Sequence, residues 1–320
     1  MRIGKSLFIL LSITILATAC GSATPKPSGS STLKIAVLPI IDTLPMYVAQ
    51  QEGLFSKAGV NVEFIAVASA PERDQLIASG QADGMINETL STFFFNKDKT
   101  QVQIVRYALR PTEKAPHFFI LASAKSGIAT PDQLKGVEVG VSQGTIIEYV
   151  NYRLLEQNGL TADEIITIAV PKIPDRLALL GSGELSAAVL PDPSAALAIQ
   201  QGANVVVDDA AYPQYGFSVI SFRKVVIDQN PGAIRSFLDA IEQATQSINA
   251  NPENYTSILS EQKLVPAPLL ESYSVPPYPT AGIPTEAEWN DALIWAKEKG
   301  MLTVDVSYLS SVSAEFLPKQ

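Results

Sequence analysis

Short apolar runs alternate with amphipathic segments along most of the chain beyond residue 32. Apolar runs of about four to eight residues between turn residues are typical of buried strands. Segments that begin with a capping residue or Pro and end at Gly are typical of helices. The predicted strands are 33–38, 60–67, 82–87, 103–108, 118–122, 137–141, 165–170, 187–190, 205–207 and 217–222. The predicted helices are 47–55, 71–80, one from 88, 145–158, 174–181, 231–250, 252–262 and 285–300, with shorter ones after the capping boxes at 130 and 161.

Strands that alternate with helices predict an α/β fold with mainly parallel, helix-covered sheets. The alternation forms two blocks, and helices predominate after residue 222. We therefore expect two lobes, with 33–118 and 218–320 forming lobe I and 119–217 forming lobe II. The chain would cross between the lobes near Phe118–Ser123 and Tyr215–Ser221, and crossing strands of this kind form a hinge.

The N-terminal region has the pattern of a targeting signal. Arg2 and Lys5 precede an apolar run of 13 residues, Leu7 to Ala19. That run is too short to span a bilayer and has the length of a signal-peptide core, so we expect residues 1–19 to be removed. Residues 20–32 are rich in Ser, Gly and Pro, which predicts a flexible tether.

Composition narrows the possible functions. Apolar residues make up 47% of the chain and charged residues 17%, as in a folded globular protein, and the net charge of −9 argues against nucleic acid as a partner. Cys20 is the only cysteine and His117 the only histidine. The sequence therefore excludes an intrachain disulfide and a zinc site of the Cys/His kind. We expect no metal and no cofactor.

Several segments in chain order resemble the type II periplasmic solute-binding proteins of ABC importers for sulfonates, nitrate, thiamine-pyrimidine precursors and riboflavin. The segments are 44–55, 59–63, 76–84, 132–137, 283–285 and 295–302. The resemblance implies the two-lobed type II fold, a small solute bound between the lobes, a monomer, and delivery to an ABC permease with its ATPase.

The end of the apolar run resembles a bacterial lipobox, where small residues precede a cysteine that becomes lipidated. Its Leu16 lies four residues before Cys20, whereas the family usually has Leu three residues before. The resemblance implies that Cys20 is lipidated and anchors the protein to the cell membrane at its extracytoplasmic face. The alternative is an ordinary secretory peptide with an incidental cysteine.

In open parallel sheets, ligands bind beyond the carboxyl ends of the strands. The expected ligand-binding residues are Asp42, Tyr47, Glu72, Asn87, Ser142, Gln143, Thr145, Tyr149, Asp192 and Tyr215. Residues 142–145 end a strand and open a helix, so free backbone N–H groups would point at the cleft. The resemblance places a polar or anionic ligand group there. Simple helix capping by Ser142 is the alternative.

The residues near the expected cleft also favour one class of ligand. The acids are Asp42, Glu72, Glu88, Glu148 and Asp192. They disfavour a free anion, because a desolvated charge needs an opposite partner, and the neighbouring tyrosines could stack on a flat ring. We therefore expect a flat heterocyclic vitamin or precursor, such as riboflavin or a thiamine pyrimidine. A sulfonate, taurine or nitrate is the alternative if Arg106 and Arg110 reach the cleft, whereas Arg73 is expected to point outward.

Other classes of protein are disfavoured, and we expect no catalytic residues. Residues 140–144 match the G-x-S-x-G elbow of α/β-hydrolases, but the histidine of that fold follows the serine, and His117 precedes Ser142. We expect His117 to be structural. A pyrimidine-forming enzyme of thiamine synthesis has the same fold, but that branch needs a cysteine-rich motif that this chain lacks. A surface lipoprotein that binds a partner protein and no solute stays open.

Overall fold

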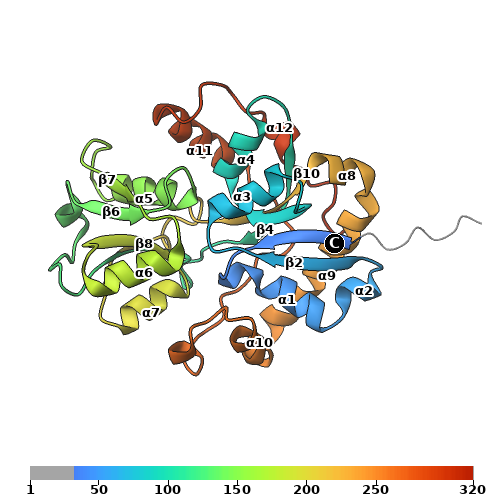
Figure 1. Ribbon diagram of the computed structural model, residues 1–320, viewed down its shortest axis with the longest axis horizontal. Coiled ribbons are helices and arrows are strands. Elements are labelled where there is room, and N and C mark those ends of the chain that lie inside the picture. The colour runs from blue at the N-terminus through green and yellow to red at the C-terminus, as the bar shows by residue number, and fades with distance from the viewer. Residues whose placement is uncertain (1–31, 320) are drawn as a thin grey trace, which may run out of the picture.

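The computed structural model describes residues 32–319. The predicted signal peptide, Cys20 and nearly all of the predicted tether lie outside the described residues. Each of the ten predicted strands overlaps an observed strand, and the strands form two five-stranded sheets. Figure 1 shows the sheets side by side along the long axis of the molecule, each covered by helices on both faces. We call the part around the first sheet lobe I and the part around the second lobe II.

The sheet of lobe I has the strand order β2-β1-β3-β10-β4. Its strands are β1 (Thr32–Val37), β2 (Asn61–Ala66), β3 (Gly84–Asn87), β4 (Val102–Leu109) and β10 (Ser218–Arg223). β1 is parallel to β2 and β3, whereas β10 is antiparallel to β3 and β4. β4 therefore runs in the same direction as β1, β2 and β3, and four of the five strands are parallel, as expected for a mainly parallel sheet. The late strand β10 enters this sheet in the opposite direction, after the chain has passed through lobe II.

The sheet of lobe II has the strand order β7-β6-β8-β5-β9. Its strands are β5 (Phe118–Ala122), β6 (Glu138–Val141), β7 (Ile166–Ala169), β8 (Ala187–Pro191) and β9 (Asn204–Asp208). β6 is parallel to β7 and β8, and β5 is antiparallel to β8 and β9. This sheet likewise has one reversed strand, β5, by which the chain enters the lobe.

The helices occupy nearly all of the predicted segments. They are α1 (Leu44–Gln51), α2 (Leu54–Lys57), α3 (Ala70–Ala78), α4 (Thr89–Asn96), α5 (Ile146–Gln157), α6 (Ile173–Ser182), α7 (Ser194–Gln200), α8 (Lys224–Gln229), α9 (Pro231–Ala250), α10 (Thr256–Glu261), α11 (Glu286–Glu298) and α12 (Tyr308–Ser311). The single helix expected over 47–55 is two helices, because Gly53 between them has φ +67°, a left-handed conformation that ends a helix. The capping box at Thr130 opens a 3₁₀ helix, Pro131–Leu134, and the one at Thr161 opens only a turn.

The chain passes between the sheets twice, through residues 110–117 and 209–217. The predicted crossings at Phe118–Ser123 and Tyr215–Ser221 lie a few residues too late, because β5 and β10 already belong to the sheets. The late helices return to lobe I, where α9 packs on α1 and α2, and α11 packs on α4. The described helices include none that is long and apolar enough to cross a membrane.

Candidate functional site

A small cavity of about 60 Å³ lies between the two lobes, beside the first crossing segment. Both lobes contribute to its wall, and His117 of the crossing segment completes it. The lobe I residues are Leu38, Ile40, Asp42, Ser69, Ala70, Arg73, Ile86, Asn87, Glu88 and Ser218. The lobe II residues are Phe118, Ser142, Thr145, Ile146, Ile147, Pro171, Ile173, Arg176 and Pro191.

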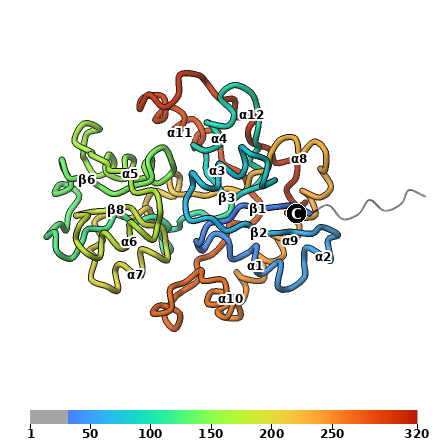
Figure 2. Tube along the Cα trace, viewed as in Figure 1, coloured from blue at the N-terminus to red at the C-terminus, as the bar shows by residue number. Residues whose placement is uncertain are grey.

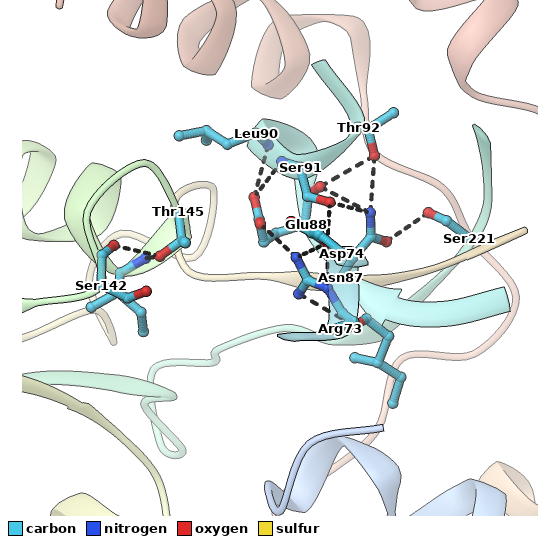
Figure 3. A network of polar contacts seen from close by, with 12 residues as sticks. Arg73, Asp74, Asn87, Glu88, Leu90, Ser91, Thr92, Ser142, Thr145 and Ser221 are labelled. Atoms are coloured by element: carbon cyan, nitrogen blue, oxygen red, sulfur yellow. Dashed lines mark hydrogen bonds and ion pairs between the residues drawn. The ribbon is translucent and has the colours of Figure 1, made fainter. Parts of the chain in front are cut away.

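A polar network forms the lobe I side of the cavity, as Figure 3 shows. Arg73 of α3 lies 2.8 Å from Asp74 and 3.3 Å from Glu88, and its side chain is only 2% exposed. Glu88 also caps α4, since its Oε2 accepts hydrogen bonds from the N–H groups of Leu90 and Ser91. Burial raises the pKa of Glu88 although Arg73 opposes this effect. The charge of Arg73 is thus balanced by carboxylates of its own lobe.

Asn87, at the end of β3, extends this network away from the cavity. Its Oδ1 accepts a hydrogen bond from Ser221 of β10 at 2.6 Å, and its Nδ2 donates to Thr92 at 3.1 Å. These bonds fix the end of β3 against β10 and against the first turn of α4. The backbone next to Glu88, between β3 and α4, is fixed as a result.

His117 and Asp42 form a second charged pair, where the first crossing segment meets lobe I. Nδ1 of His117 lies 2.8 Å from the carbonyl oxygen of Gly216, and Nε2 lies 3.2 Å from Oδ1 of Asp42. Both ring nitrogens face acceptors, which requires the doubly protonated imidazolium. Burial by itself lowers the pKa of His117, but the Asp42 carboxylate raises it to about 9. Asp42 also accepts a hydrogen bond from the hydroxyl of Ser218, the first residue of β10, which directly follows the second crossing segment.

On the lobe II side, the loop after β6 does not present all its backbone groups to the cavity. The Gly144 N–H donates to Oε2 of Glu148 at 2.7 Å, and the Thr145 hydroxyl accepts from the Ile147 N–H at 3.2 Å. The expected cradle of free N–H groups is therefore partly closed by an internal carboxylate. The buried hydroxyl of Ser142, by contrast, has no hydrogen-bond partner.

Arg176 of α6 is fully buried in the wall of lobe II. Its Nε donates to the Val189 carbonyl at 2.9 Å, and its Nη1 donates to the carbonyls of Val170 and Pro171. Its Nη2 has no partner, and no carboxylate of the described residues pairs with it. Burial lowers the pKa of Arg176 to about 10, so the guanidinium is charged at neutral pH.

Arg73 and Arg176 occupy matching positions in the two lobes. Each lies two residues after a Pro of its helix, and each donates to a strand carbonyl 13 residues later, Ile86 in β3 or Val189 in β8. Two residues beyond that carbonyl, lobe I has Glu88 and lobe II has Pro191. The carboxylate that balances Arg73 thus has no counterpart beside Arg176.

The cavity wall contains five ionisable residues, whose charges can be summed. They are Asp42, Arg73, Glu88, His117 and Arg176. With His117 protonated they comprise three cations and two anions, a net charge of +1. Asp74, which also pairs with Arg73, lies outside the wall. Among the described residues, Arg73 and His117 are paired with carboxylates and Arg176 is not, so a negative charge beside Arg176 costs less than a positive one.

Four of the ten expected ligand-binding residues line the cavity, and these are Asp42, Asn87, Ser142 and Thr145. The other six lie elsewhere. Tyr47 packs edge-to-face on Phe64 at 5.1 Å, and Tyr215 stacks on Tyr212. The Tyr149 hydroxyl donates to Asp291 of α11 at 2.5 Å. These three rings therefore contact protein groups outside the cavity wall.

The remaining three expected residues are polar and also bond to the protein itself. Glu72 accepts from the Ala68 N–H at 2.9 Å, and Gln143 donates to Thr167 at 3.3 Å. Asp192 accepts a hydrogen bond from the Tyr273 hydroxyl. None of the three lies in the cavity wall.

The expectation about Arg73 is wrong, and the two cations that could have favoured an anion, Arg106 and Arg110, do not reach the cavity wall. Arg73 does not point outward but lies in the cavity wall, because it is on the buried face of α3 together with Ile77, one turn later. Arg106 pairs with Glu242 at 2.9 Å and Arg110 with Glu288 at 2.6 Å, and neither lies in the cavity wall. The functional candidate that the sequence reading missed is Arg176. The repeated pattern Pro-Glu-Arg at 71–73 and Pro-Asp-Arg at 174–176 is the signal that could have revealed it.

Comparison with solved structures confirms the two-lobed fold. The alkanesulfonate-binding protein SsuA from Xanthomonas axonopodis pv. citri, bound to MOPS, superimposes with a TM-score of 0.75 at 16% identity over 89% of this chain and 99% of that chain. The periplasmic nitrate-binding protein NrtA from Synechocystis PCC 6803 gives a TM-score of 0.61 at 21% identity, over 74% of this chain and 68% of that chain.

Sequence comparison gives the same picture. The nitrate/nitrite binding protein NrtA of Nostoc sp. (strain PCC 7120) is 23% identical over 265 residues, which are 76% of this chain. The chain spans 60% of the length of that relative. The model of the NMT1/THI5-like family matches residues 40–255, more than half of the sequence. The chain therefore belongs to the NMT1/THI5-like family, with the fold of the periplasmic binding proteins.

Proposed function

We propose that this protein is the extracytoplasmic solute-binding component of an ABC importer and that it binds a small organic anion between its lobes. The fold and the family support the transport role, since relatives are named for binding nitrate, nitrite and alkanesulfonate. Closure of the lobes on the solute would bury it, and the closed shape would be recognised by the permease.

The single observation behind the anionic ligand is the unpaired guanidinium of Arg176. A buried cation without a carboxylate is costly, and the matching Arg73 has Glu88 at the corresponding place. A ligand anion would supply beside Arg176 the charge that Glu88 supplies beside Arg73. Its oxygens would accept from Nη2 of Arg176 and from the free hydroxyl of Ser142, and charge-assisted bonds of this kind are the strong ones.

The apolar part of the wall favours an organic anion over nitrate. Ten wall residues are aliphatic, aromatic or proline: Leu38, Ile40, Ala70, Ile86, Phe118, Ile146, Ile147, Pro171, Ile173 and Pro191. A short alkyl group would bury its surface against them, at roughly 25 cal/mol per Å². The cavity of about 60 Å³ has room for about four to six water molecules, judged from the space that one water needs. A short alkanesulfonate has a comparable number of non-hydrogen atoms.

A flat heterocycle, the ligand that the sequence favoured, is the second candidate. The acids Asp42 and Glu88 do lie in the wall, but each is matched by a cation, His117 or Arg73. The expected tyrosines are engaged with protein groups, and Phe118 is the aromatic residue of the wall. A heterocycle would therefore require a wider opening of the lobes and a rearrangement of these side chains.

Three further parts of the proposal concern the whole protein. We propose that it acts as a monomer and catalyses no reaction, and that Cys20 is lipidated and holds it on the membrane. Replacing Cys20 by Ser should release the protein from the membrane fraction of the producing cells. Retention of the variant on the membrane would count against the lipid anchor.

The ligand class is tested by calorimetric titration of the purified protein with ethanesulfonate, ethanesulfonamide, nitrate and riboflavin. Ethanesulfonamide is the matched control, because it has nearly the same shape without the charge. We expect ethanesulfonate to bind at least about 100-fold more tightly than the sulfonamide, from the strength of charged hydrogen bonds, and more tightly than nitrate. Equal binding of sulfonate and sulfonamide, or tighter binding of riboflavin, would overturn the anionic assignment.

A further inference from the structure

Residues 265–279, which we call the strap, connect α10 to α11 and extend to the other lobe. Figure 2 shows this segment below the two lobes, beside α10 and α7. Both of its ends are fixed in lobe I. At one end, Val265 is buried in the core. At the other, the Tyr278 hydroxyl donates to the Ile41 carbonyl at 2.6 Å, and the Tyr278 backbone forms two 2.8 Å hydrogen bonds with Asn249 of α9.

The middle of the strap contacts lobe II. The Tyr273 hydroxyl donates a hydrogen bond to Oδ2 of Asp192, which directly follows β8. Nε2 of Gln200, at the end of α7, donates to the Pro268 carbonyl at 3.3 Å. The short helix Ala267–Leu269 of the strap packs on α7. Both ends of the strap belong to lobe I. These hydrogen bonds and the packing on α7 therefore form a noncovalent link between the two lobes.

The strap has a conformationally restricted backbone. Pro266, Pro268, Pro276, Pro277 and Pro279 restrict its backbone. Asp192 is held from the other side, because its backbone N–H donates to the His117 carbonyl at 2.8 Å, next to the hinge. Because the backbones of Tyr273 and Asp192 are both restricted before they meet, the hydrogen bond between their side chains forms with little loss of conformational entropy.

We propose that Tyr273 and Asp192 are positioning residues that hold the lobes closed, and that they set the ligand affinity without touching the ligand. Neither lines the cavity, although Pro191 next to Asp192 does. Separating the lobes to admit a solute must break the Tyr273–Asp192 hydrogen bond. The bond needs no ligand to form, so the closed form is populated in the ligand-free protein. The effect on affinity rests on the proposed function, whereas the effect on closure does not.

The test is a distance measurement between the lobes of the ligand-free protein. Spin labels at Lys57→Cys in lobe I and Ala162→Cys in lobe II, in a Cys20→Ser background, report the distance by pulsed electron resonance. Both positions are exposed. We expect the unmodified strap to give a closed population that falls several-fold in Tyr273→Phe and in Asp192→Ala. Tyr273→Phe removes only the hydroxyl, so loss of folding is not expected, and circular dichroism checks this.

The matched control is Tyr255→Phe. Its hydroxyl donates to Glu52 at 2.8 Å, a bond of the same kind that stays within lobe I. The control should leave the distance distribution unchanged. In a second measurement, ethanesulfonate should bind Tyr273→Phe about tenfold more weakly, as expected for one charged hydrogen bond. Closure that is identical in Tyr273→Phe and the parent protein, or a ligand-free parent protein that is entirely open, would overturn the proposal. Absence of ethanesulfonate binding with an intact closure effect would instead contradict the proposed ligand.

Discussion

His117 and Asp42 form a buried ion pair, 3.2 Å between Nε2 and Oδ1, at the end of the first crossing segment, directly before β5 of lobe II. Their side chains are 2% and 0% exposed. The same imidazole bonds to Gly216 of the second crossing segment, so one charged pair ties both crossings together. The two crossing segments are therefore joined by a charged pair as well as by chain connectivity.

Replacing His117 by Gln should destabilise the protein, because it leaves the carboxylate of Asp42 buried without its cation. The expected loss is about 3–5 kcal/mol of unfolding free energy, the usual cost of breaking a buried pair from one side. Denaturant unfolding measures it. The double variant His117→Gln with Asp42→Asn should recover part of the loss. If the double variant were less stable than the single one, the pair would not be the source of the effect.

The stability of the protein should fall as the pH rises from about 4 to 9. Burial raises the pKa of Asp192 to about 6 and that of Asp209 to about 7, and Asp42 raises that of His117 to about 9. In each case the folded state binds the proton more tightly than the unfolded state, so the stabilisation is complete at lower pH and is lost as the pH rises through the folded pKa.

His117 alone should contribute about 3 kcal/mol, fully present below pH 6.5 and lost as the pH rises through about 9. Denaturant unfolding at a series of pH values measures the slope. In His117→Gln the decline between pH 6.5 and 9 should become shallower. A stability that is flat or rises across this interval in the parent protein would contradict the assignment of a charged His117.

Replacing Arg176 by Met should abolish the binding of ethanesulfonate, with a loss of at least about 100-fold, because the apolar chain keeps the volume but removes the charge. Folding should be preserved, since Arg176 bonds only to carbonyls and its charge is unbalanced. Arg235→Met is the matched control, because Arg235 lies on the surface and pairs with Glu315. Calorimetric titration of both variants compares them, and equal affinities would remove Arg176 from the site.

Replacing Glu88 by Gln should strengthen anion binding. Gln keeps the acceptor that caps α4 but removes one of the two carboxylates that balance Arg73, so the cavity wall becomes more positive. Removing one negative charge from the wall of the site should raise the affinity for ethanesulfonate by roughly tenfold. A cationic or neutral ligand would gain nothing. Weaker binding of ethanesulfonate by Glu88→Gln, measured by the same titration, would contradict the charge count of the cavity wall.

The sequence was sufficient to predict the order of strands and helices, because apolar runs and Pro or Gly boundaries are local signals. Gly53 shows the limit of this reading, since its left-handed conformation splits one expected helix into two. The one reversed strand of each otherwise parallel sheet, β10 in lobe I and β5 in lobe II, was not predictable in this way. Its direction depends on which sheet receives β5 and β10, and that is a long-range choice.

The candidate site was less accessible to prediction. The loop residues Ser142 and Thr145 were placed in the cavity wall because strand ends converge at one edge of a sheet. The side of a helix that faces the cavity was not fixed by the sequence alone, so Arg73 was expected to point outward and Tyr149 inward. Arg176 is a candidate only because no carboxylate of the described chain lies beside it at the end of β8. That absence can be recognised only once the arrangement of the strands is known.

The most direct test of the anionic cleft is a crystal structure of the protein with the tightest-binding compound of the panel. The account predicts an anionic group between the lobes, with oxygens within hydrogen-bond distance of Nη2 of Arg176 and Oγ of Ser142. It also predicts that the organic part lies against Ile147 and Ile173. A ligand whose neutral ring bonds to Asp42 or Glu88, with Arg176 left without a ligand contact, would contradict it.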